Sequence, residues 1–150
     1  TLTAIHALES ALAAPAPGRE RSWRDSVCAS LRDLDAAMGL EAANTDRPDS
    51  LVADIGRLHP RLRSRVRGLR AQYQHIREDV ASLLRSVEGT ADRDALPDYN
   101  DLRHRIAWLL TALRHQRERE SDLIYEAYYQ TYEIDLGAEP TSTALGGETS

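Results

Sequence analysis

Apolar side chains recur at every third or fourth position over most of the chain, and this spacing constrains the fold more than any other feature. In the segment 61–88 they stand at Leu62, Val66, Leu69, Tyr73, Ile76, Val80, Leu83 and Val87. Such spacing places all of them on one face of an α-helix, which turns by about 100° per residue. Because no segment shows the alternation typical of a strand, the pattern predicts an all-α protein.

Stretches rich in proline, glycine and small polar residues divide the chain into predicted helices. These breaks read "APAPG", "NTDRPDS" and "GTADRDALPD". The segments between them predict long helices over 2–13, 19–43, 61–88 and 99–135 and a short helix over 49–58. Asp49 or Ser50 is expected to cap the short helix, and Asp98 and Asn100 are candidate caps of the last one.

Four main helices with short connections favour antiparallel neighbours, so residues 1–136 are expected to form an up-down antiparallel four-helix bundle. The last helix would be about 50 Å long at a rise of 1.5 Å per residue, which is long enough to overhang the bundle. Residues 137–150 read "GAEPTSTALGGETS", a small, polar, glycine-rich composition that predicts a flexible C-terminal tail.

Charge and composition exclude several classes of partner. The 24 acidic residues outnumber the 19 basic ones, for a net charge of −5, which argues against a nucleic-acid partner. No apolar run approaches the roughly 20 residues of a membrane-spanning helix. Cys28 is the only cysteine, so no intramolecular disulfide can form, and a reducing, cytoplasmic location is expected.

Polar residues on the apolar faces are the candidate functional positions, because burying them without a partner is costly. Glu9 lies within the apolar series of the first helix, with His6 beside it. Tyr73 belongs to the series of the third long helix, while Gln116 and Glu120 continue that of the last. Inward carboxylates and histidines on several helices of a bundle commonly hold metals, especially iron pairs. The alternative is that each carboxylate pairs with an inward arginine.

The order of these segments resembles the hemerythrin-like (HHE) family over roughly residues 1–136. The chain opens with "IHALESAL" and continues through a long helix into "TDRPDSL". It then has "LRAQYQHI", where the family often has "LRxEHxxL", and closes with "LLTALRHQRERESDLIYEAY". The resemblance implies a four-helix bundle holding a di-iron centre. In that family the centre binds or senses oxygen, or handles iron and nitric oxide.

Carried onto this chain, the resemblance together with the apolar faces gives a candidate set of metal ligands. The set is His6, Glu9, Tyr73, His115 and Glu120. The cofactor it implies is non-haem iron.

This chain also departs from the family's pattern. The end of the second helix carries Glu41 but no histidine, and Arg77 stands four residues after Tyr73, where its charge would repel a metal. On the last helix the apolar face places Gln116 inward and His115 outward. The metal centre is therefore expected to be lost or much reduced, with Arg117 as a candidate ion-pair partner of Glu120.

Two surface features complete the pattern. "RLHPRLRSRVRGLR" holds six arginines, which we interpret as a solvated helix face, with a basic patch for an acidic partner as the alternative. Four tyrosines cluster near the end of the last helix, where Tyr128 is expected to lean toward the apolar face. They are Tyr125, Tyr128, Tyr129 and Tyr132. We interpret the cluster as a cover for the open end of the bundle, with a partner surface, or a redox relay beside a metal, as the alternatives.

Three functional hypotheses follow from these observations. The first is a non-catalytic binding or interaction domain whose metal centre is lost or much reduced, so that no cofactor is its expected state. The second is a non-haem iron protein that binds or senses oxygen or nitric oxide, or handles iron. The third is a helical module that forms a homodimer or docks a protein partner through the tyrosine-rich end of its last helix.

Overall fold

The computed structural model describes residues 1–14, 18–89 and 98–137. Within them the secondary structure consists of helices joined by turns. Its elements are α1 (Leu2–Ala13), α2 (Glu20–Thr45), α3 (Leu51–Leu58), the 3-10 turn η1 (Pro60–Leu62), α4 (Arg63–Gly89) and α5 (Tyr99–Gly137). The predicted all-α class is confirmed, and each predicted helix lies within about two residues of an observed one, the usual uncertainty of helix ends. The predicted tail begins at the last residue of α5, and the remainder of it lies outside the described residues.

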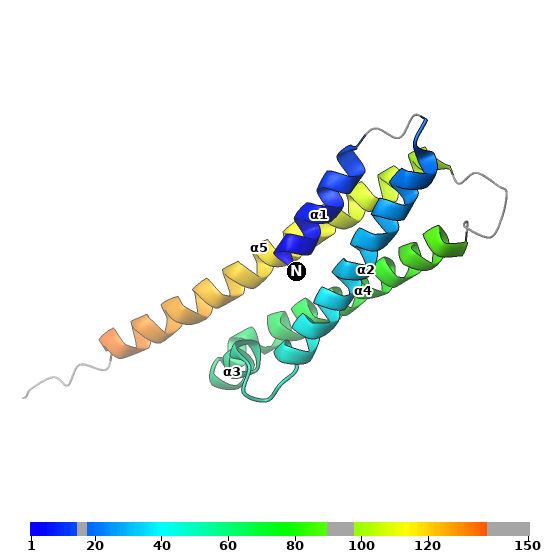
Figure 1. Ribbon diagram of the computed structural model, residues 1–150. Coiled ribbons are helices and arrows are strands. Elements are labelled where there is room, and N and C mark those ends of the chain that lie inside the picture. The colour runs from blue at the N-terminus through cyan, green and yellow to red at the C-terminus, as the bar shows by residue number, and fades with distance from the viewer. Residues whose placement is uncertain (15–17, 90–97, 138–150) are drawn as a thin grey trace, which may run out of the picture.

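Helices α1, α2, α4 and α5 run in alternating directions, and each packs against two of the others. Figure 1 shows the chain passing up α1, down α2, up α4 and down α5. α1 packs against α2 and α5, and α4 packs against the same two helices from the other side. α1 is short and covers one end of this arrangement, whereas α3 packs on α4, α2 and α5 at the other end.

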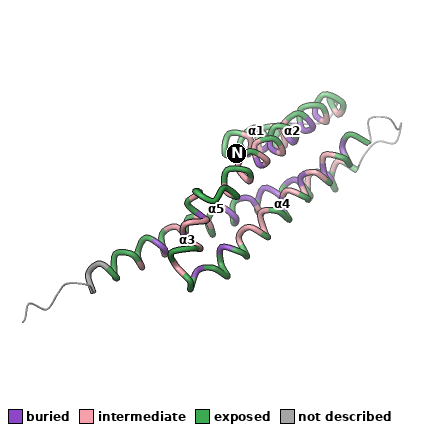
Figure 2. Tube along the Cα trace, turned by 90° about the horizontal axis from the view of Figure 1, so that it is seen from below, coloured by how far each residue is buried: buried purple, intermediate pink, exposed green. Residues whose placement is uncertain are grey.

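The apolar interior consists of two separate clusters. The larger one lies between α1, α2, α4 and the first half of α5, and Leu8, Leu34 and Ile106 are among its fully buried members. The smaller one joins α3, η1, the start of α4 and the second half of α5. Its buried members are Val52, Ile55, Leu62, Val66, Leu123 and Ala127. Figure 2 shows buried positions recurring along one side of α2 and of α4, as their apolar spacing predicts.

Two of the predicted N-caps form. Ser50 Oγ accepts a hydrogen bond from the backbone nitrogen of Ala53 at 3.2 Å, which starts α3. At the start of α5, Asp98 Oδ1 accepts from the nitrogens of Asn100 and Asp101 at 3.0 and 3.2 Å. Each carboxylate or hydroxyl satisfies backbone donors that have no partner in the first turn.

The end of α5 extends past the rest of the molecule. Ala127 is the last buried residue of this helix among those whose side chains are described, and the helix continues to Gly137 (Figure 1). The expectation that Tyr128 leans toward the apolar face is wrong, because its side chain is 74% exposed. It lies about 100° around the helix from Ala127, on a side that meets solvent. None of the described helices has both the length and the apolar character of a membrane span.

Leu8→Ala tests whether α1 is part of the main core. Because Leu8 is fully buried, the free energy of unfolding should fall by about 2–4 kcal/mol, through lost transfer energy and a residual cavity. Leu40→Ala is the matched control, because Leu40 is 70% exposed and its truncation should change stability by less than about 0.5 kcal/mol. Chemical denaturation measures both values. Equal effects would mean that α1 does not pack as described.

Candidate functional site

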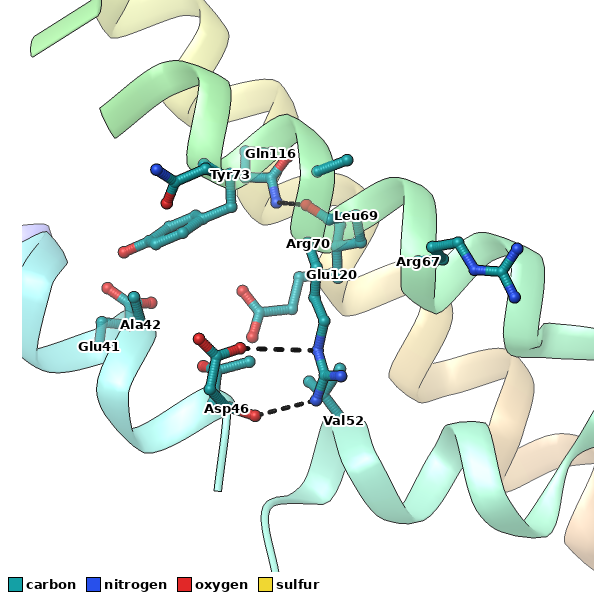
Figure 3. Close-up of a pocket in the computed structure, with 13 residues that line it drawn as sticks. Glu41, Ala42, Asp46, Val52, Arg67, Leu69, Arg70, Tyr73, Gln116 and Glu120 are labelled. Atoms are coloured by element: carbon teal, nitrogen blue, oxygen red, sulfur yellow. Dashed lines mark hydrogen bonds and ion pairs between the residues drawn. The ribbon is translucent and has the colours of Figure 1, made fainter. Parts of the chain in front are cut away.

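A cleft opens where the two apolar clusters meet. It has a volume of about 410 Å³ and lies between the end of α2, α3, α4 and the middle of α5. On α5, Leu113 is the last member of the larger cluster and Leu123 the first of the smaller one. The two turns between them bring Gln116 and Glu120 to the cleft (Figure 3). The apolar series of α5 is thus interrupted by polar groups at the point where a cavity forms.

Gln116 is the one buried polar side chain of the described residues, with only 3% of its surface exposed. Its Nε2 donates a hydrogen bond to the carbonyl oxygen of Leu69 on α4 at 3.0 Å. Its Oε1 is buried and receives no hydrogen bond from the described part of the chain. An unpaired buried acceptor costs about 1–3 kcal/mol of folding free energy, so a hydrogen bond from a ligand to this oxygen would be stabilising. The expectation that Gln116 faces inward, with His115 outside, is confirmed.

Glu120 points into the cleft from α5 and is half-buried (Figure 3). Burial raises the pKa of its carboxyl group, the negative charge of Glu41 raises it further, and the positive charge of Arg117 acts in the opposite direction. Within residues 1–14, 18–89 and 98–137, no hydrogen bond or ion pair reaches this carboxylate, so the expected ion pair with Arg117 does not form there. The Glu120 carboxylate therefore lacks both a hydrogen-bond donor and a paired cation among the described residues.

Glu41 and Tyr73 supply the opposite side of the cleft. The Glu41 carboxylate accepts a hydrogen bond from the Thr1 hydroxyl group. Tyr73 donates from its hydroxyl to the carbonyl oxygen of Met38 at 3.3 Å. Burial raises the pKa of the Tyr73 phenol, and the nearby charge of Glu41 adds to the shift. The phenol therefore stays protonated at neutral pH, and the phenolate form that iron would bind is disfavoured.

Arg70 closes the lower edge of the cleft, with its guanidinium turned toward the end of α2. Its Nη2 donates to the carbonyl oxygen of Thr45 at 3.1 Å, and its Nε lies 3.9 Å from Asp46 Oδ1 (Figure 3). Both partners are at the C-terminal end of α2, where a cation satisfies free carbonyls and opposes the helix dipole. Arg67 also lines the cleft, but Figure 3 shows its guanidinium directed away from the carboxylates.

Two of the proposed metal ligands lie on the surface between α1 and α5. Glu9 forms an ion pair with Arg114, and its Oε2 lies 3.2 Å from His6 Nδ1. Burial acts to raise the pKa of Glu9, but the hydrogen bonds from His6 and Arg114 outweigh it and the net direction is downward. Glu9 thus has an arginine partner, which was the alternative to a metal.

The five proposed ligands occupy three separate places. His115 is exposed on the outer side of α5, where its Nδ1 lies 3.2 Å from Glu118 Oε2. Of the proposed set, only Tyr73 and Glu120 reach the cleft. The described residues include no group of three or more His, Cys, Asp or Glu side chains that could hold a metal ion. The residues that line the cleft therefore do not fit the histidine-rich di-iron centre that the resemblance implies.

Comparison with known proteins adds no family to this picture. No protein-family model matches the chain. Searches of curated proteins and of solved structures likewise found no significant match.

Replacing Glu120 by Gln should stabilise the protein in a pH-dependent way. Because the pKa of Glu120 in the folded state is raised above its ordinary value of 4.5, the folded state binds more protons than the unfolded state between the two pKa values. Stability contributed by this group is therefore lost as the pH rises through that interval. Removing the charge should raise stability at pH 7 by somewhat less than about 1 kcal/mol, since the group is half-exposed. The difference should disappear near pH 4.

Thermal unfolding of the two proteins between pH 4 and pH 8 measures this difference. The exposed Asp33→Asn serves as a control for loss of a surface carboxylate. If Glu120→Gln were destabilising at pH 7, the carboxylate would have a favourable partner and the description of an unpaired group would be wrong.

Proposed function

We propose that the protein is a hemerythrin-like four-helix bundle that works as a non-catalytic binding domain, with its ligand site in the cleft between α2, α3, α4 and α5. Support for the fold assignment comes from the order of helices and from the closed set of neighbours that α1, α2, α4 and α5 form. Support for the binding role comes from one observation above all. The cleft collects acceptor groups, at Glu41, Gln116 and Glu120, that the protein does not fully satisfy itself.

The ligand that best complements this cleft is an organic ammonium ion with an apolar body. An ammonium group between Glu41 and Glu120 would offset both the burial of Glu120 and the repulsion between the two carboxylates. Its remaining N–H groups can reach acceptors such as Gln116 Oε1. Apolar walls, formed by the side chains of Leu69 and Val52, would cover a hydrocarbon chain.

An anionic ligand is less well served by the same cleft. Arg70 donates one hydrogen bond to the carbonyl oxygen of Thr45 and is turned toward Asp46, and Arg67 is directed outward. A carboxylate or phosphate would therefore meet two glutamates, while both arginines at the cleft are turned away from them.

The lining residues also explain why we propose binding rather than catalysis. Serine, cysteine and histidine are absent from the described residues that line the cleft. The serine–histidine and cysteine–histidine pairs of nucleophilic catalysis are therefore not formed by these residues. The Tyr73 phenol, with its raised pKa, is better suited to donating a hydrogen bond than to accepting a proton.

A matched set of three probes tests the proposal. Hexylammonium, hexanol and hexanoate share a chain length and differ in charge. Titration followed by ¹⁵N-resolved NMR should show saturable shifts at Glu41, Gln116 and Glu120 with hexylammonium and much weaker ones with the other two. Equal binding of hexanol would reduce the site to an apolar pocket, and preferred binding of hexanoate would overturn the proposal.

Substitutions locate the binding in the same experiment. The double change Glu41→Gln and Glu120→Gln should weaken hexylammonium binding by about tenfold or more, equivalent to at least about 1.4 kcal/mol. Glu88→Gln is the control, because Glu88 pairs with Arg32 at the far end of α4. An unchanged affinity in the double variant would place the binding elsewhere.

Elemental analysis separates this proposal from the non-haem iron alternative. After expression in iron-supplemented medium, the purified protein should contain far less than one iron per chain. Stoichiometric iron with a visible absorption band that is lost in Tyr73→Phe or Glu120→Gln would instead establish a metal centre.

A further inference from the structure

The exposed end of α5 carries a stripe of aromatic side chains. Four tyrosines, each between 52% and 74% exposed, form this tyrosine stripe. They are Tyr125, Tyr128, Tyr129 and Tyr132. Their spacing of three, one and three residues places them on one face of the helix. Aromatic residues exposed as a contiguous set are typical of protein interfaces rather than of solvated helix faces.

α5 therefore has two apolar faces at this level. Leu123 and Ala127 bury one face in the smaller cluster. At about 100° per residue, the tyrosine stripe lies on the opposite side of the same turns. No described element of the chain covers it, so the stripe has no partner among residues 1–14, 18–89 and 98–137.

Charge is segregated strongly around this end of the molecule. Residues 121–134 carry Asp122, Glu126 and Glu133 and no basic residue. Residues 57–70, which form the end of α3, η1 and the start of α4, carry six arginines and no acidic residue. The two segments are neighbours in one chain, since Arg65 forms an ion pair with Glu126.

We propose that the tyrosine stripe binds the same stripe of a second copy, with the two α5 ends antiparallel about a two-fold axis. In that arrangement the overhang of each copy lies along the edge of the partner's stripe, where the Arg65–Glu126 pair brings the arginine segment beside α5. The acidic end of one copy then faces the arginine segment of its partner, and symmetry repeats the contact. Guanidinium groups placed over the phenol rings would add cation–π attraction. The chain supplies both complementary surfaces, and so a second copy is the occupant that its own charges select.

Sedimentation velocity over a range of concentrations tests the dimer directly. The protein should move from 16.8 kDa to twice that mass as its concentration rises, and added salt should weaken association because the flanking contacts are ionic. Tyr128→Ser with Tyr132→Ser should leave a folded monomer, with helicity checked by circular dichroism. Trp108→Ser is the control: Trp108 is also exposed but lies outside the stripe, and this variant should still dimerise. A wild-type chain that stays monomeric at high concentration would overturn the proposal.

A charge exchange tests the antiparallel arrangement itself. Arg61 and Glu133 are both exposed and form no ion pair within the described residues. Arg61→Glu and Glu133→Arg should each weaken the homodimer by about tenfold or more, by placing like charges in contact. An equimolar mixture of the two variants should recover association. In the mixed dimer the two introduced charges are opposite and meet each other, and the native Arg61 of one variant meets the native Glu133 of the other. A mixture no stronger than the separate variants would refute antiparallel docking.

Discussion

The hydrogen bond from Gln116 to the carbonyl oxygen of Leu69 is the contact around which the two halves of the molecule are arranged. It ties α5 to α4 at a position where an apolar side chain would otherwise continue the core. Because an amide is too polar to join either apolar cluster, the interior divides at this point into a larger and a smaller part. The cleft occupies the space that this division leaves.

The polar groups of the cleft lower the free energy of unfolding. A buried amide oxygen without a donor and a half-buried carboxylate whose pKa is raised both oppose folding. Leucine at either position would extend the apolar series of α5. Sequences commonly break their own packing rules at sites that serve function, and such a site combines a cavity with groups that need a partner. An ammonium ligand would supply charge and hydrogen-bond donors in one group.

Helix positions and phases could be read from the sequence because they depend on local spacing. The apolar series predicted every helix to within about two residues, and the phase of α5 correctly separated Gln116 from His115. The membership of the cleft could not be obtained in this way. Arg70 belongs to a stretch that we interpreted as a solvated face, yet it reaches across to the end of α2. That contact depends on how closely α2 approaches α4, which no periodicity encodes.

Because α4 and α5 run through both clusters, the molecule need not unfold as one cooperative unit. The smaller cluster has far fewer buried side chains than the larger one, and one of its main contributors is the eight-residue α3. Local opening of α3 therefore costs less than global unfolding, and it would remove the wall of the cleft that Val52 forms while the larger cluster stays intact. Under the proposed binding role, the stability of α3 would set how often this wall of the cleft opens, and amide hydrogen exchange in the helix measures the free energy of that opening.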